Sequence, residues 1–182
     1  AIVDWVVLEL PSTATATNIA AAQCALLQRD GDVDSAVLSA TLLFGAAAAD
    51  YYLAVRHRNH LGCIQATTRS LTPTTQMVDF GLAATATYGT EAERSTDGRE
   101  VLWAGNVVRD GKLLYTGSNN DRDPILQVIG GSVPTATTTG YRAADVNLDG
   151  VVKYTGQNND RDAVLENIGG STPNTSRAEQ LP

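Results

Sequence analysis

The sequence predicts a mainly β protein with an N-terminal antiparallel β-sandwich over residues 1–100 and a duplicated loop-and-short-helix module over residues 101–182. Two observations lead to this prediction. Short β-prone segments, separated by turn residues at spacings of about 8 to 15, fill the first half. A segment of the second half occurs twice, and a repeat of this kind marks a duplicated structural unit.

Six segments of the first half have the composition of strands. Their expected number favours a sandwich of two packed sheets. Residues 85–100 are interpreted as a linker or edge segment, and residues 101–103 as the strand that leads into the repeats. The six segments are Val3–Leu10, Ala22–Gln28, Ala36–Phe44, Tyr51–Arg58, Cys63–Thr68 and Met77–Phe80.

The repeat covers residues 104–135 and 143–174, at an offset of 39 residues. Aligning residues 106–135 with residues 145–174 gives 17 identities in 30 positions without a gap. In the first copy we expect Asp121 to cap a helix of about eight residues that ends at Gly130. In the second copy Asp160 is the corresponding cap.

The second copy begins with a string typical of cation-binding loops. Asp145, Asn147 and Asp149 place oxygen-bearing side chains at alternate positions, and Gly150 follows directly. An EF-hand loop starts in this way, with ligands at positions 1, 3 and 5 and a glycine that permits the sharp turn. The carbonyl of Val151 would add another oxygen. Calcium is therefore the expected cofactor, although such strings also occur in ordinary Asp/Asn turns.

The loop then departs from the EF-hand pattern, because position 12 is Gly156 instead of an acidic residue. Asp160 or Asp162 is expected to close the coordination sphere from the start of the following helix. The alternative is that Asp160 is only a cap and that Asp162 is favoured by the helix dipole.

The first copy has weaker ligands, since position 3 is Val108. It either binds a second cation or serves only as a folding partner. Its candidate oxygens come from Asn106, Asp110, the Lys112 carbonyl, Asp121 and Asp123. We expect the two loops to pair through Leu113 and Val152. The expected small core is Ile125, Leu126, Ile129, Val164, Leu165 and Ile168.

The phrases LWAGN, YTGxNNDRDPIL and DVNLDG resemble tandem dockerin-like calcium repeats of secreted and surface proteins from Bacteroidota-type bacteria. The resemblance covers about residues 101–173. It implies calcium-binding, non-catalytic repeats that follow a β-sandwich. Dockerins bind cohesin domains, but Gly156 and the inserted YTGQNN depart from that pattern. More loosely, the whole chain resembles subunits of extracellular bacterial fibrils.

Charge and composition bear on location. The formal net charge of −7 argues against nucleic acid as a partner. No apolar run approaches the length of about 20 residues that spans a membrane. Since residue 1 leads directly into strand-like sequence, we expect a mature or excised product that is extracellular or on the cell surface.

The histidines and cysteines of the first half have both functional and simpler structural interpretations. His57 and His60 could form a metal pair, but arginines flank His57, and a strand end with its turn is favoured. Cys24 and Cys63 either pair or are small buried residues. No catalytic motif is found, so we expect no enzymatic activity.

Two short patterns suggest glycans, one at Ser35 and one at Asn174. Since Val3 and Trp5 lie almost at the terminus, the first strand could add to the sheet of another copy, or could belong only to its own sheet. The expected function is a calcium-stabilised structural subunit that self-assembles into a fibril or surface layer. The alternative is a dockerin-like module that anchors a larger secreted protein.

Overall fold

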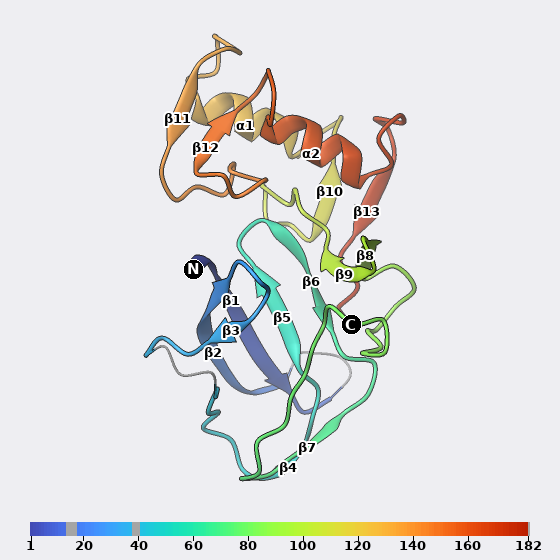
Figure 1. The fold of residues 1–182 in the computed structure, drawn as a ribbon. Coiled ribbons are helices and arrows are strands. Elements are labelled where there is room, and N and C mark those ends of the chain that lie inside the picture. Colours follow the sequence, from blue (N-terminus) through green and yellow to red (C-terminus); the bar gives the residue numbers. More distant parts are fainter. Residues whose placement is uncertain (14–17, 38–40, 182) are drawn as a thin grey trace. The chain divides into compact units, whose positions relative to one another are not determined.

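A computed structural model describes residues 1–13, 18–37 and 41–181 of the chain. The chain divides into two compact units (Figure 1). The second unit consists of Arg58–Leu61 and Trp103–Glu179, and the remaining residues form the first unit. Each unit is described separately below.

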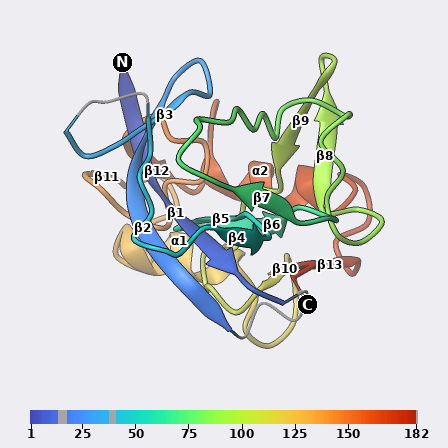
Figure 2. The same cartoon turned by 90° about the horizontal axis from the view of Figure 1, so that it is seen from below.

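The first unit is built on a five-stranded sheet with the strand order β3-β2-β1-β5-β6. Its strands are β1 (Ile2–Pro11), β2 (Ile19–Gln28), β3 (Val33–Asp34), β5 (Ala54–His57) and β6 (His60–Ile64), of which β6 belongs to this unit from Gly62 onward. β1 pairs antiparallel with β2 along its whole length and with β5 over residues 6–9 (Figures 1 and 2). The first strand of the chain is therefore an internal strand of this sheet.

Alternation along β1 explains its position. Val6, Leu8 and Leu10 are buried, whereas Trp5 on the opposite face is 44% exposed. Side chains at every second position of a strand share one face, so one face of β1 is apolar and enters the core. Asp4 also lies on the buried face, with Oδ2 3.2 Å from Nε2 of His57.

Two further two-stranded sheets complete the first unit. They are β4 (Ala49–Tyr51) with β7 (Arg69–Leu71) and β8 (Glu93–Thr96) with β9 (Arg99–Leu102). The prediction of a mainly β fold is confirmed. Among the described residues the other sheets have only two strands each, so the predicted sandwich of two large packed sheets is not seen.

Some predicted strands are wrong. Residues 36–37 form a turn and residues 41–44 are irregular, while residues 38–40 lie outside the described part of the chain. Residues 77–80 form no strand, and Met77 is 87% exposed. In both cases apolar composition suggested a strand, but Val37 and Leu43 are also more than 80% exposed. Residues 85–100, which were expected to be a linker or an edge segment, contain β8 and the start of β9, so they are not only a linker.

The second unit contains a strand, a helix and a strand, twice in succession. The first set is β10 (Lys112–Leu114), α1 (Arg122–Val128) and β11 (Thr137–Thr139). The second set is β12 (Val151–Lys153), α2 (Asp160–Asn167) and β13 (Ser176–Ala178). The strands match at the offset of 39 residues and the helices match within one residue, so the structural repeat extends beyond the aligned sequence to residue 178.

The two sets exchange their last strands. β10 of the first set pairs with β13 of the second, and β12 of the second pairs with β11 of the first. Matched hydrogen bonds follow the same exchange. The hydroxyl of Thr116 donates to the Pro173 carbonyl at 3.1 Å, and that of Thr155 donates to the Pro134 carbonyl at 3.0 Å.

This exchange corrects the predicted pairing of the loops. Leu113 lies opposite Arg177, and Val152 lies opposite Thr138. Each strand therefore has a return strand as its partner, and the two apolar residues point into different clusters. The larger cluster consists of Val107, Ile125, Ile129, Ala144, Val146, Val152 and Val164, with Leu126 against it. The smaller one consists of Leu61, Leu113 and Ile168, with Leu165 against it.

No helix among the described residues is long and apolar enough to cross a membrane.

Candidate metal centre

Two loops of the second unit have the same backbone conformation. We define loop 1 as residues 106–121 and loop 2 as residues 145–160. Positive φ angles occur at matched positions, at Arg109 (64°) and Leu148 (60°), and at Gly111 (75°) and Gly150 (87°). Further matched pairs are Gly117 with Gly156 and Asn119 with Asn158. Residues with positive φ are uncommon outside glycine, so their occurrence at matched positions shows that the two copies share an unusual backbone conformation.

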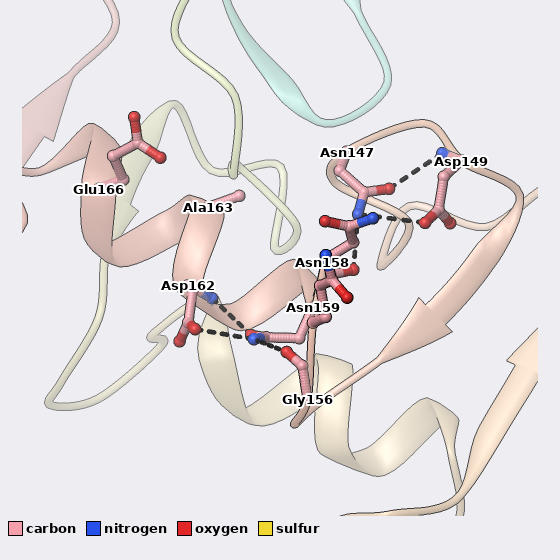
Figure 3. Close-up of a pocket in the computed structure, with 9 residues that line it drawn as sticks. Asn147, Asp149, Gly156, Asn158, Asn159, Asp162, Ala163 and Glu166 are labelled. Atoms are coloured by element: carbon pink, nitrogen blue, oxygen red, sulfur yellow. Dashed lines mark hydrogen bonds between the residues drawn. The ribbon is translucent and has the colours of Figure 1, made fainter.

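Side chains of loop 2 curl the backbone around its interior. Oδ2 of Asp145 accepts from the N–H of Gly150 at 3.1 Å. Oδ1 of Asn147 accepts from the N–H of Asp149, and Oδ1 of Asp149 accepts from the N–H of Val151, both at 2.9 Å. Figure 3 shows Asn147 and Asp149 side by side at this turn. The alternate positions predicted from the sequence are thus brought into one loop.

One oxygen in loop 2 has no partner. Asp145 is 4% exposed, and its Oδ1 is buried without a hydrogen bond. Burial raises the pKa of this carboxyl group, while the hydrogen bond from Gly150 and the charge of Arg58 oppose the rise. Buried polar atoms in folded proteins almost always have a partner, so this carboxylate oxygen is open to a water molecule or a cation.

Asp160 joins the start of loop 2 to the strand and helix that follow. It is completely buried, and its Oδ1 accepts from Val146 N–H at 2.6 Å while its Oδ2 accepts from Lys153 N–H at 2.8 Å. Burial raises its pKa, and the nearby Asp145 carboxylate raises it further. Asp160 therefore lies against the loop and close to Asp145.

Asn159, and not Asp160, is the N-cap of α2. Its Oδ1 accepts from Asp162 N–H at 2.9 Å, and its Nδ2 donates to Asp162 Oδ2 at 2.7 Å and to the Gly156 carbonyl. Arg161 donates to the other oxygen of Asp162 at 2.9 Å. These bonds, led by the one from Asn159, lower the pKa of Asp162. The predicted cap, Asp160, is therefore wrong by one residue. The sequence could not distinguish the two positions, because both Asn and Asp are good caps.

A hollow of about 520 Å³ lies beside loop 2. In Figure 3 the Asp162 side chain bonds to Asn159 at the start of α2, apart from Asn147 and Asp149 on the loop. Asp162 therefore does not join the oxygens of loop 2 in this structure. The lining residues are Asn147, Asp149, Gly156, Gln157, Asn158, Asn159, Asp162, Ala163 and Glu166.

Loop 1 satisfies its own polar groups. Oδ1 of Asn106 accepts from Asp110 N–H at 3.2 Å, and Oδ1 of Asp110 accepts from Lys112 N–H at 3.0 Å. The completely buried Asp121 accepts from Val108 N–H at 3.0 Å and Leu114 N–H at 2.8 Å. Burial raises the pKa of Asp121 to about 6.

The same one-residue correction applies to the cap of α1. Asp121 makes no cap hydrogen bond, and Oδ1 of Asn120 accepts from Asp123 N–H at 2.9 Å. Asp123 is also paired with Arg122, in the way that Asp162 is paired with Arg161. Asp123 is thus held at the helix and away from the loop-1 turn.

Within the described ranges no three His, Cys, Asp or Glu side chains gather closely enough to hold a metal ion. A cation in loop 2 would therefore also need the amide oxygen of Asn147 and the carbonyl of Val151. Oxygen ligands of this mixed kind suit calcium, which takes six to eight of them in flexible geometry.

The other candidates from the sequence lie apart. The side chain of His57 is buried beside Asp4, and Nδ1 of His60 bonds to Asn59 Oδ1 at 2.8 Å. Cys24 and Cys63 are not joined by a disulfide; Cys24 is exposed, and Cys63 is buried with its thiol donating to Oε1 of Glu93 at 3.7 Å. Ser35 is half-buried, and the exposed Asn174 accepts through Oδ1 from the hydroxyl of Thr116 at 3.0 Å.

Sequence reasoning missed Arg58 and Asn59 as neighbours of loop 2. The Arg58 guanidinium lies 3.8 Å from Asp145 Oδ2, and Asn59 Nδ2 donates to the Asp145 carbonyl at 2.7 Å. In the segment RHRNHLG the histidines are the apparent candidates for a site. No sequence pattern predicts the contact between Asn59 and Asp145, which are 86 residues apart.

Comparison with protein-family models, with curated proteins and with solved structures finds no match for this chain. The function is therefore argued below from the chain's own residues.

Proposed function

We propose that this protein is a non-enzymatic extracellular structural protein whose second unit is stabilised by one calcium ion in loop 2. The residues that would hold the ion are Asp145, Asn147, Asp149, the Val151 carbonyl and Asp160. When bound, the ion would supply positive charge to a loop that otherwise buries negative charge.

The observation that carries this proposal is Oδ1 of Asp145, which is buried without a partner. Leaving a buried acceptor unsatisfied costs about 1–3 kcal/mol, and more when the group is charged. A cation that binds the folded loop removes this cost. It also stabilises the fold by mass action, by about 2.7 kcal/mol at a concentration 100 times the dissociation constant.

Loop 1 differs at the decisive position. Asn106 replaces the charged residue, and its Oδ1 already accepts a hydrogen bond from Asp110. Val108 offers no side-chain oxygen where loop 2 has Asn147, whereas Asp121 matches Asp160, since both carboxylates accept from backbone N–H groups. Loop 1 therefore folds without an ion, which supports one calcium ion per chain.

The structural role rests on the architecture of the second unit. Its helices have seven and eight residues, too short to be stable alone in water. A bound ion at the start of α2 would hold the loop, strand and helix of one repeat together. Self-assembly into a fibril or surface layer remains part of the proposal, but addition of a strand to β1 receives no support, because β1 is paired on both sides.

Calcium titration by calorimetry, together with melting in calcium and in chelator, tests the proposal. We expect one site, and a higher melting temperature in calcium. Asp145→Asn should abolish both effects, whereas Asp110→Asn in loop 1 makes the same change of charge and should preserve them. Identical melting curves in calcium and chelator for the unaltered protein would refute the calcium site.

Sedimentation and negative-stain microscopy of the calcium-loaded protein test the assembly. Filaments or large oligomers without an added partner are expected. A protein that stays monomeric but is captured by a cohesin-type domain would instead establish the anchoring function.

A further inference from the structure

The side chain of Arg58 lies beside the carboxylate of loop 2. It is 9% exposed, and its Nη2 is 3.8 Å from Oδ2 of Asp145. Its Nη1 donates to the carbonyl of Arg142, and its guanidinium carbon lies 4.4 Å from the centre of the Tyr141 ring. The positive charge is therefore fixed by three different contacts within the residues that lead into loop 2.

The backbone beside Arg58 is also anchored. Asn59 is completely buried, and its Nδ2 donates to the carbonyls of Ala143 at 2.8 Å and Asp145 at 2.7 Å. Its own carbonyl accepts from the N–H groups of Gly105 and Asn106 at 2.8 and 2.9 Å. Asn59 thus contacts the start of both loops and holds the backbone next to Arg58 beside loop 2.

We infer that Arg58 is an internal cation that balances Asp145 when loop 2 is empty and that weakens calcium binding to this loop. The inference rests on the proposed calcium function. Like charges a few ångströms apart repel strongly in a partly buried setting, so a divalent ion at Asp145 would meet the fixed guanidinium charge. Arg58 therefore sets the calcium affinity of loop 2 without serving as a ligand.

Calorimetric titration of the full chain with calcium tests this inference through charge and geometry separately. Arg58→Gln removes the charge, and we expect the dissociation constant to fall at least tenfold. Arg58→Lys keeps a charge in the same place, so its dissociation constant should stay within about threefold of the unaltered value. Arg109→Gln is the matched control, because it removes an exposed charge from loop 1 and should leave the constant unchanged.

Melting in chelator and in saturating calcium separates this role from simple packing. Arg58→Gln should lower the melting temperature in chelator, where it leaves Asp145 unbalanced, and this difference should disappear or reverse in calcium. An equal loss of stability in both conditions, or an unchanged or weaker affinity, would overturn the inference.

The two proposals fail in different ways. If the unaltered protein shows no calcium heat and no shift in melting temperature, the calcium site itself is refuted, and the role of Arg58 falls with it. If the unaltered protein binds calcium at Asp145 but Arg58→Gln does not tighten the binding, only the role of Arg58 is refuted.

Discussion

The buried carboxyl group of Asp121 should make the calcium-free protein more stable as the pH falls from 7.5 to 5. Burial raises its pKa from 3.8 to about 6 in the folded protein. The folded state then binds the proton more tightly than the unfolded state, so lowering the pH through 6 favours folding. The gain is complete only below the unfolded value.

The size of this effect follows from the two pKa values. With 3.8 in the unfolded chain and about 6 in the folded one, proton binding adds about 1.4 kcal/mol to the free energy of unfolding between pH 7.5 and pH 5. For a urea dependence of about 2 kcal/mol per molar, the midpoint should rise by about 0.7 M. Asp145 and Asp160, whose pKa values burial also raises, should add to the gain.

Urea unfolding in chelator, followed by tryptophan fluorescence in a Trp5→Phe background, would measure this effect in the second unit. Trp103 is then the only tryptophan, because the chain has two. It reports on the second unit, where the guanidinium carbon of Arg177 lies 3.4 Å from the centre of its ring. At pH 7.5 Asp121→Asn should cost about 1–3 kcal/mol, because the amide group of the new side chain would face a backbone N–H from which the carboxylate accepts in the unaltered protein. The gap between the two proteins should therefore widen by about 1.4 kcal/mol toward pH 5. A gap that stays constant with pH would refute the assignment to Asp121.

Three further outcomes are expected. Gly150→Ala should lower the free energy of unfolding by about 1–2 kcal/mol, because φ there is +87°, although nothing crowds the added carbon. Gly45→Ala is the control, since it lies in equally open space without a positive φ and should have little effect. Equal urea midpoints for the two variants would contradict the strain at Gly150. Asn159→Ala should destabilise the second unit by about 1 kcal/mol through loss of the cap, and an unchanged urea midpoint would restore Asp160 to that role. In the native protein a thiol reagent should modify Cys24 quickly and Cys63 only on unfolding, and two equally fast thiols would contradict their different exposure.

The second unit was easier to predict than the first because its information is local. The turns of both loops depend on Gly111 and Gly150, and the sequence marks them directly. The one-residue error at the caps arose in the string NND, where Asn159 and Asp160 are both good cap residues. Only their hydrogen bonds distinguish them, because Asn159 accepts from the helix and Asp160 accepts from the loop backbone. The role of Asp160 as an acceptor for loop backbone required the folded structure.

Long-range pairing could not be predicted in the same way. The return strands β11 and β13 are rich in Thr and Ser, without the apolar alternation that identifies a strand, so Leu113 and Val152 were the obvious partners for each other. In the first unit, the apolar run of residues 36–44 suggested a strand. The described part of that run forms no strand, and Leu43 is exposed. β8 was not predicted, because its sequence is polar.

The exchange of β11 and β13 makes the two copies of the repeat depend on each other. One copy, synthesised alone, would present a strand whose partner in the intact chain lies in the other copy. We therefore expect the two copies to fold together as one unit, although Asn106 and Asp145 give their loops different ligands.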